Sequence, residues 1–117
     1  MTRRVLIVDD DHDLAEGLAE LLSMHGHKVE IAGNGKEAVD IYDRTDFDIV
    51  FMDVRMPVMS GVDSFFAIRR LRPTAKIVMM TGFQEPTVAR TLDAGALGLL
   101  YKPFRVDAML TYINKVT

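Results

Sequence analysis

Val5-Leu6-Ile7-Val8, followed directly by Asp9-Asp10, is the stretch that decides the fold, because four apolar residues run straight into two carboxylates. Three later runs repeat the pattern: Ile49-Val50-Phe51-Met52 before Asp53, Ile77-Val78-Met79-Met80 before Thr81, and Leu99-Leu100-Tyr101 before Lys102-Pro103. Short apolar runs of this kind are typical of strands buried on both faces of a parallel sheet. Ligands of such sheets bind outside the carboxyl ends of the strands, so the pattern predicts a site where the four endings meet.

Segments of helical periodicity separate these runs. We expect strands at 4–8, 28–32, 49–52, 76–80 and 98–101, and helices at 11–25, 36–44, 62–71, 86–94 and 106–116. Strict alternation of strands and helices is typical of an α/β fold with a parallel sheet. Right-handed crossovers then place the helices on both faces of that sheet.

Length and composition indicate one domain spanning residues 1–117, with 49% hydrophobic and 26% charged residues. Because the chain has no cysteine, disulfides, zinc-thiolate sites and cysteine nucleophiles are excluded. The first apolar run, Val5 to Val8, is too short for a signal peptide or a membrane span, so we expect a cytoplasmic protein without membrane contact. A net charge of -3 without a Lys/Arg cluster argues against direct binding of nucleic acid.

An acidic cluster is the chemical centre of the predicted sheet edge. Asp9, Asp10 and Asp53 place three carboxylates at the ends of neighbouring strands, where their repulsion is costly unless a cation is bound. Asp9-Asp10 alone is equally typical of helix capping. Asp53, however, follows four apolar residues, where an unpaired charge has no packing role. The cluster therefore predicts Mg²⁺, which prefers hard oxygen ligands.

Thr81 and Lys102 complete a plausible site for phosphoryl transfer. Taken singly, Thr81 is more typical of a strand or cap residue, and Lys102 of a solvated surface lysine. Together with the acidic cluster they supply a hydroxyl donor and a positive charge for phosphoryl oxygens. Asp53 would then be the nucleophile and form an aspartyl phosphate.

The chain resembles the receiver domains of bacterial two-component response regulators, including those of the chemotaxis-regulator type. The resemblance covers nearly all of the chain and rests on five motifs: Val8-Asp9-Asp10, Asp53-Val54-Arg55-Met56-Pro57-Val58-Met59-Ser60-Gly61, Met80-Thr81-Gly82, Gly95-Ala96 and Lys102-Pro103-Phe104. It implies a flavodoxin-like, doubly wound (βα)5 fold with strands in the order 2-1-3-4-5. The chain fits a stand-alone regulator, or the receiver portion of a transcription factor, an enzyme or a hybrid kinase.

The resemblance also implies a role for each site residue. Asp53 would accept a phosphoryl group from the phosphohistidine of a sensor histidine kinase or a phosphotransfer protein. The implied ligands of Mg²⁺ are Asp9, Asp10, Asp53 and the backbone carbonyl of Arg55. Lys102 and Thr81 would bind phosphoryl oxygens, and a cis peptide bond before Pro103 would aim Lys102 at the pocket. Beyond this self-catalysed transfer and slow loss of phosphate, no enzyme activity is expected.

Phosphorylation is expected to switch the face formed by residues 86–116. In the family, Thr81 moves inward and an aromatic residue three positions before the lysine turns with it; in this chain that position is Leu99. The implied partners of the switched face are an output domain or protein, or a second copy of the chain in a phosphorylation-dependent homodimer. Strand residue Leu100 is expected in the core, and Leu97 and Leu99 are candidates for a partner contact.

Two positions bear on the lifetime of the phosphoryl group. Arg55 lies two residues after Asp53, and Phe83 lies two after Thr81, so their large side chains would shield an aspartyl phosphate from water. An equally good interpretation is that Arg55 simply lies over a negative pocket and that Phe83 packs on a loop. Two rival functions are a Mg²⁺-dependent hydrolase and a docking module that works without phosphate. Arg55 argues against the hydrolase, because such enzymes usually carry an aspartate there, and the intact set of site residues argues against the docking module.

Overall fold

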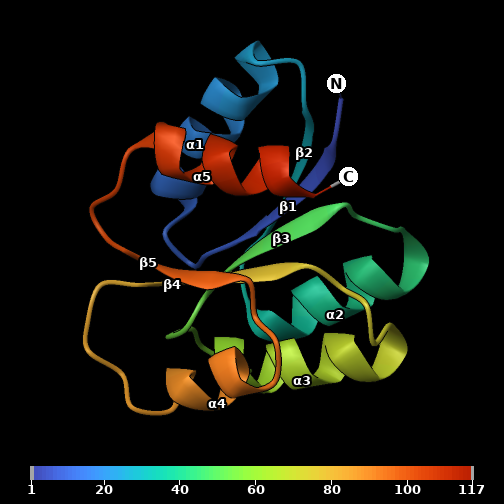
Figure 1. The fold of residues 1–117 in the computed structure, drawn as a ribbon, viewed down its shortest axis with the longest axis vertical. Helices are drawn as coiled ribbons and strands as arrows, with labels where there is room; N and C mark the ends of the chain where they lie inside the picture. Colours follow the sequence, from blue (N-terminus) through green and yellow to red (C-terminus); the bar gives the residue numbers. More distant parts are fainter. Residues whose placement is uncertain (1, 117) are drawn as a thin grey trace.

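The structure, a computed structural model, describes residues 2–116 and alternates strands with helices (Figure 1). The strands are β1 (Arg4–Val8), β2 (Lys28–Ala32), β3 (Ile49–Asp53), β4 (Ile77–Thr81) and β5 (Gly98–Tyr101). The helices are α1 (His12–Met24), α2 (Gly35–Arg44), α3 (Gly61–Leu71), α4 (Val88–Asp93) and α5 (Val106–Lys115). Met1 and Thr117, the ends of the predicted domain, lie outside the described residues.

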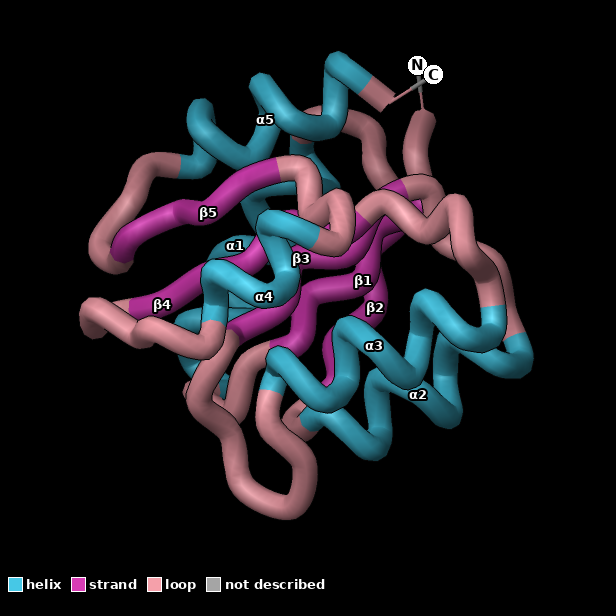
Figure 2. The backbone as a smooth tube through the Cα atoms, turned by 60° about the horizontal axis from the view of Figure 1, so that its bottom comes forward, coloured by secondary structure: helices cyan, strands magenta, loops and turns pink. Residues whose placement is uncertain are grey.

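All strand pairs are parallel, and the strands lie in the order β2-β1-β3-β4-β5. The predicted fold class and strand order are therefore confirmed. Two register pairs bring the polar strand endings to within one residue of each other: Asp53 is opposite Met80, which precedes Thr81, and Thr81 is opposite Tyr101, which precedes Lys102. The tube view shows the strands lying between the two sets of helices (Figure 2).

Two hydrophobic layers sandwich the sheet. Side chains alternate along a strand, so Leu6 and Val8 of β1 belong to the layer under α2, α3 and α4, whereas Val5 and Ile7 belong to the layer under α1 and α5. Every residue of β3 and β4 is buried. This explains the continuous apolar runs in the sequence, because both faces of the central strands are covered.

Three of the helices begin at a side-chain cap. The side chains of Asp11, Asn34 and Ser60 accept hydrogen bonds from the backbone N–H three residues later, at distances of 2.8–3.1 Å. Each cap satisfies one of the N–H groups that a helix start leaves without a partner. The cap of α1 is therefore Asp11 and neither residue of the Asp9-Asp10 pair.

Helix α4 is shorter than predicted. We expected it at 86–94, with Pro86 in its first turn, but it spans Val88–Asp93. Residues 85–90 are instead linked by bonds between residues three apart, such as that from the Val88 N–H to the Glu85 carbonyl (3.1 Å). Thr87 makes no side-chain cap. The proline therefore lies in a tight turn ahead of the helix, and the segment between β4 and α4 is longer than the sequence indicated.

Strand β5 is an edge strand, and its leucines are less buried than expected. Leu100, predicted to be core, is half-buried and packs against the layer under α1 and α5. Leu99 is half-buried against the opposite layer, and Leu97 is 38% exposed. An edge strand has a neighbour on one side alone, so the apolar run did not indicate full burial.

The loop after β3 returns to its own strand at Gly61. The Gly61 N–H donates to the Val54 carbonyl (2.8 Å), and a Cβ atom at Gly61 would lie 1.9 Å from the Asp53 carbonyl oxygen. Only glycine allows this approach, which fixes where α3 begins relative to Asp53. Within the part of the chain that the structure describes, no helix has the length and apolar character that crossing a membrane requires.

Replacing Gly61 with alanine should lower the free energy of unfolding by about 1–3 kcal/mol, because the new methyl group overlaps backbone atoms of β3 and the loop. The matched control is Gly17→Ala in α1, where an added Cβ meets nothing within 4 Å. That change should stabilise the protein by about 0.5–1 kcal/mol. Urea unfolding of both variants tests this, and equal effects of the two substitutions would contradict the close approach.

Candidate functional site

Three carboxylates meet at the carboxyl edge of the sheet. Asp9 and Asp10 follow β1, and Asp53 is the last residue of β3. Each presents a carboxylate oxygen within 4.8 Å of the others. Asp9 and Asp53 are buried, with 1% and 6% of their surface exposed, whereas Asp10 is open to solvent. The structure therefore gathers all three acids that the sequence predicted as metal ligands.

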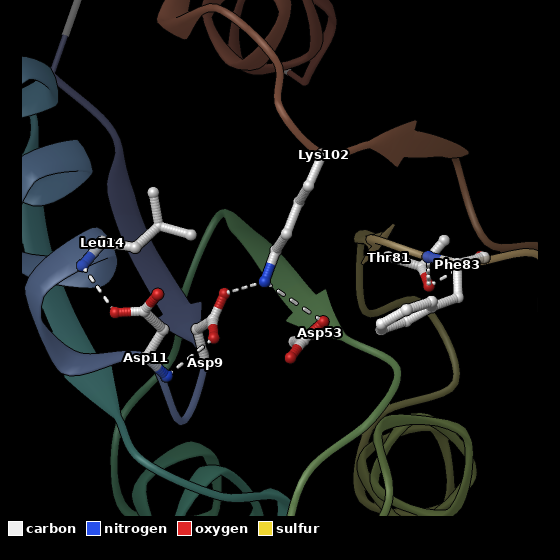
Figure 3. A network of polar contacts seen from close by, with 7 residues as sticks. All are labelled: Asp9, Asp11, Leu14, Asp53, Thr81, Phe83 and Lys102. Carbon is white, nitrogen blue, oxygen red and sulfur yellow. Dashed lines mark hydrogen bonds and ion pairs between the residues drawn. The ribbon is translucent and has the colours of Figure 1, made fainter.

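Lys102 reaches into this cluster from the end of β5 (Figure 3). Its Nζ donates to Asp9 Oδ2 at 2.6 Å and lies 3.4 Å from Asp53 Oδ1. The Lys102 N–H donates to the Thr81 carbonyl (2.8 Å), and the Lys102–Pro103 peptide bond is cis, as the resemblance implies. One ammonium group thus lies between two buried carboxylates.

Burial dominates the titration of Asp53. Burial and, after it, the charge of Asp9 raise the pKa of that carboxyl, and Lys102 offsets only part of the rise, so that the pKa goes from 3.8 to about 6. Burial alone would lower the pKa of Lys102, but its hydrogen bond to Asp9 and the charges of Asp53 and Asp9 give a net increase. Once Asp53 is ionised, the three carboxylates of the site carry more negative charge than the one lysine neutralises. Clustered carboxylates with this excess charge fit a hard divalent cation.

Asp9 is held in place on both of its oxygens. While Oδ2 accepts from Lys102, Oδ1 accepts from the Asp11 N–H at 2.9 Å, and the Asp9 N–H donates to the Ala32 carbonyl at 3.1 Å. Asp10 has greater freedom because it is exposed. The site thus combines two buried carboxylates, of which Asp9 is bonded at both oxygens, with one exposed carboxylate.

Thr81 lies at the same sheet edge, but its hydroxyl faces its own loop. The Oγ1 atom donates to the Phe83 carbonyl (2.9 Å) and accepts from the Phe83 N–H (3.1 Å). Figure 3 shows this closed turn set apart from the Asp53 carboxylate. The structure therefore brings Lys102 to the acids, and it holds the Thr81 hydroxyl away from them.

Arg55 and Glu85 flank an open hollow of about 570 Å³ that begins at Asp10. Arg55 Nε lies 3.0 Å from Glu85 Oε2, and the guanidinium lies 5.0 Å from the centre of the Phe83 ring. The sequence analysis singled out Arg55 and Phe83 but missed Glu85. Arg55 and Glu85 are 30 residues apart in the sequence. No spacing rule within one helix or strand connects positions so far apart.

Comparison with known proteins gives one consistent family. A family model described as the response regulator receiver domain matches residues 5–114. The chemotaxis protein CheY of Thermotoga maritima is 37% identical over 121 residues, covering 100% of this chain and 99% of that protein. Transcriptional regulatory protein PdtaR of Mycobacterium tuberculosis is 41% identical over 116 residues, covering 96% of this chain and 55% of that protein. The chain thus spans nearly all of one relative and about half of the other.

Solved structures agree. A CheY-like receiver domain protein from Methanospirillum hungatei has a TM-score of 0.92 at 29% identity, with 98% of this chain and 93% of that chain covered. The response regulator TrrA from Thermotoga maritima, solved in complex with Mg²⁺ and BeF, has a TM-score of 0.88 at 30% identity, with 98% and 99% covered. Because the family model and these relatives span almost the whole chain, the protein belongs to the response regulator receiver domain family.

Proposed function

We propose that this chain is a single phosphoacceptor domain in which Asp53 receives a phosphoryl group from the phosphohistidine of a sensor histidine kinase or a phosphotransfer protein. The observation that carries the proposal is the position of Asp53, which ends a central strand beside Asp9 with the Lys102 ammonium 3.4 Å from its carboxylate. Receiver domains are signalling domains rather than classical enzymes. We place the exchange in the cytoplasm, in keeping with a chain without cysteine.

The chemistry follows from the groups around Asp53. A carboxylate oxygen of Asp53 forms a bond to phosphorus while the bond from phosphorus to the donor's histidine nitrogen breaks, and that nitrogen keeps the electron pair. The product is a mixed anhydride on Asp53. Lys102 then donates to a phosphoryl oxygen, because its Nζ already lies beside the attacking carboxylate. Thr81 supplies a hydroxyl for a second oxygen after it leaves Phe83.

Receiver domains bind Mg²⁺ at an acidic pocket, and the residues here fit that ion. Asp9, Asp10 and Asp53 would hold it together with the backbone carbonyl of Arg55. When bound, the ion neutralises charge on the carboxylates and the transferring group. The chain's own contribution is to bury two of the carboxylates side by side and to keep the Lys102 ammonium between them. The Mg²⁺ and BeF complex of TrrA supports this assignment by similarity.

We also propose that the phosphoryl group switches the face formed by α4, β5 and α5 toward an output domain or protein, or toward a second copy of the chain. Thr81 ends β4, and the loop that follows it leads directly to α4. Movement of its hydroxyl toward Asp53 breaks two hydrogen bonds with Phe83 and frees that loop. Leu99, half-buried on the neighbouring strand, repacks in place of an aromatic residue.

Incubation with acetyl phosphate and Mg²⁺ should add one phosphoryl group to the protein, detected as a gain in intact mass. The gain should vanish in Asp53→Asn and in EDTA, because the nucleophile or the ion is then missing. Asp43→Asn, an exposed position on α2, is the matched control and should be modified like the wild type. Modification of Asp53→Asn to the same extent would refute the assignment of the acceptor.

The aspartyl phosphate should be long-lived, because Arg55 lines the hollow beside Asp10 and its guanidinium lies over the Phe83 ring. After the donor is removed, the intact mass of phosphorylated protein followed over time gives the half-life. We expect Arg55→Ala combined with Phe83→Ala to shorten it several-fold by opening a path for water. Val58→Ala, on an exposed position of the same loop, should leave it unchanged. A half-life that changes little in the double variant would exclude shielding by these two side chains.

A further inference from the structure

A chain of contacts connects the loop after β3 to the loop after β4 across the mouth of the site. Arg55 Nε lies 3.0 Å from Glu85 Oε2, and the Arg55 guanidinium lies 5.0 Å from the centre of the Phe83 ring. Phe83 in turn is bonded to the Thr81 hydroxyl through both its carbonyl and its N–H, at 2.9 and 3.1 Å. Glu85 and Thr81 are therefore linked through two intermediate residues, the side chain of Arg55 and then the ring and backbone of Phe83.

Burial shows which partner of the ion pair is fixed. The Glu85 side chain is 19% exposed, whereas that of Arg55 is 65% exposed. Among residues 2–116, Arg55 is the cation that the structure pairs with Glu85. Glu85 is thus the more buried partner of the pair, and the exposed arginine is the part that is positioned by it.

Arg55 has a second anionic partner within reach once the site is phosphorylated. It follows Asp53 by two residues and borders the same hollow as Asp10. In the resting form, Lys102 already neutralises part of the negative charge of the acidic cluster, so the Arg55 guanidinium pairs with Glu85 instead. A phosphoryl group on Asp53 adds negative charge and acceptor oxygens close to Arg55, which compete with Glu85 for it.

We propose that Glu85 is a positioning residue of the phosphoacceptor site: it pins Arg55 against Phe83 and thereby holds Thr81 in its resting turn. The inference rests on the proposed function, since the competing ligand is the phosphoryl group on Asp53. Loss of the Glu85 contact frees Arg55 for that group and removes one restraint on the loop that carries Phe83. Because the ion pair favours the resting form, its removal favours the phosphorylated form by the same free energy.

Beryllofluoride with Mg²⁺ tests this as a non-covalent mimic of the phosphoryl group. Its affinity is measured by titration for the wild type, Glu85→Gln, Arg55→Ala and the double variant. We expect Glu85→Gln to bind the mimic about two- to fivefold more tightly, the range that a solvent-accessible ion pair supplies. In the Arg55→Ala background the same substitution should have no effect, because the contact that it removes is already absent.

Simple charge repulsion predicts a different result. If Glu85 acted only as a negative charge near an anion, Glu85→Gln would tighten binding with or without Arg55, and more strongly without it. That outcome, or no tightening in the wild-type background, overturns the proposal. Titration with Mg²⁺ alone separates any effect on the cation from the effect on the mimic.

Two further measurements separate the possible failures. A wild-type protein that binds no beryllofluoride in the presence of Mg²⁺ would contradict the proposed function itself. Asp46→Asn, which breaks the exposed ion pair with Arg72, is the control and should bind the mimic like the wild type. The NMR signal of the Arg55 Nε–H should shift in Glu85→Gln and, for the wild type, on binding of the mimic. An unchanged Arg55 signal in both cases would also overturn the proposal.

Discussion

The ammonium group of Lys102 between the carboxylates of Asp9 and Asp53 is the interaction on which the site depends. One positive charge faces two buried negative charges, at 2.6 and 3.4 Å, with the exposed Asp10 close by. A buried carboxylate is costly unless it is paired and hydrogen-bonded. Lys102 meets that cost only in part, and the pKa of Asp53 is consequently raised to about 6. The incomplete pairing explains why the site fits a divalent cation.

The parallel sheet brings Lys102 to the two aspartates. Asp9 and Lys102 are 93 residues apart, and a parallel sheet brings them together because all its strands end at one edge. Gly61 lets α3 begin against the backbone of Asp53, and the Lys102 N–H donates to the Thr81 carbonyl. Asp53 and Lys102 are thus placed by backbone contacts at the ends of their strands.

Much of the fold and of the acidic cluster could be predicted from the sequence. Apolar runs that end in polar residues determined the sheet, and Asp53 stood out as a charge after a buried run. Side-chain contacts between loops could not be predicted in this way. Glu85 pairs with Arg55 across loops, and the Thr81 hydroxyl turns to Phe83 because of local backbone geometry. The start of α4 could not be predicted either, since Pro86 is equally compatible with a helix start and with a tight turn.

The raised pKa of Asp53 predicts the direction in which the stability of the protein changes with pH. Because the folded state raises the pKa of Asp53 from 3.8 to about 6, the folded protein keeps this proton where the unfolded chain has lost it. The bound proton of Asp53 therefore contributes stability that is fully present below pH 3.8 and is lost as the pH rises through about 6. The most direct measurement is the ¹³C NMR titration of the Asp53 carboxyl in EDTA and in saturating Mg²⁺. We expect a pKa of about 6 in EDTA and a clearly lower value with Mg²⁺, which competes with the proton. An ordinary pKa near 3.8 in EDTA, or a value that Mg²⁺ leaves unchanged, would contradict the account.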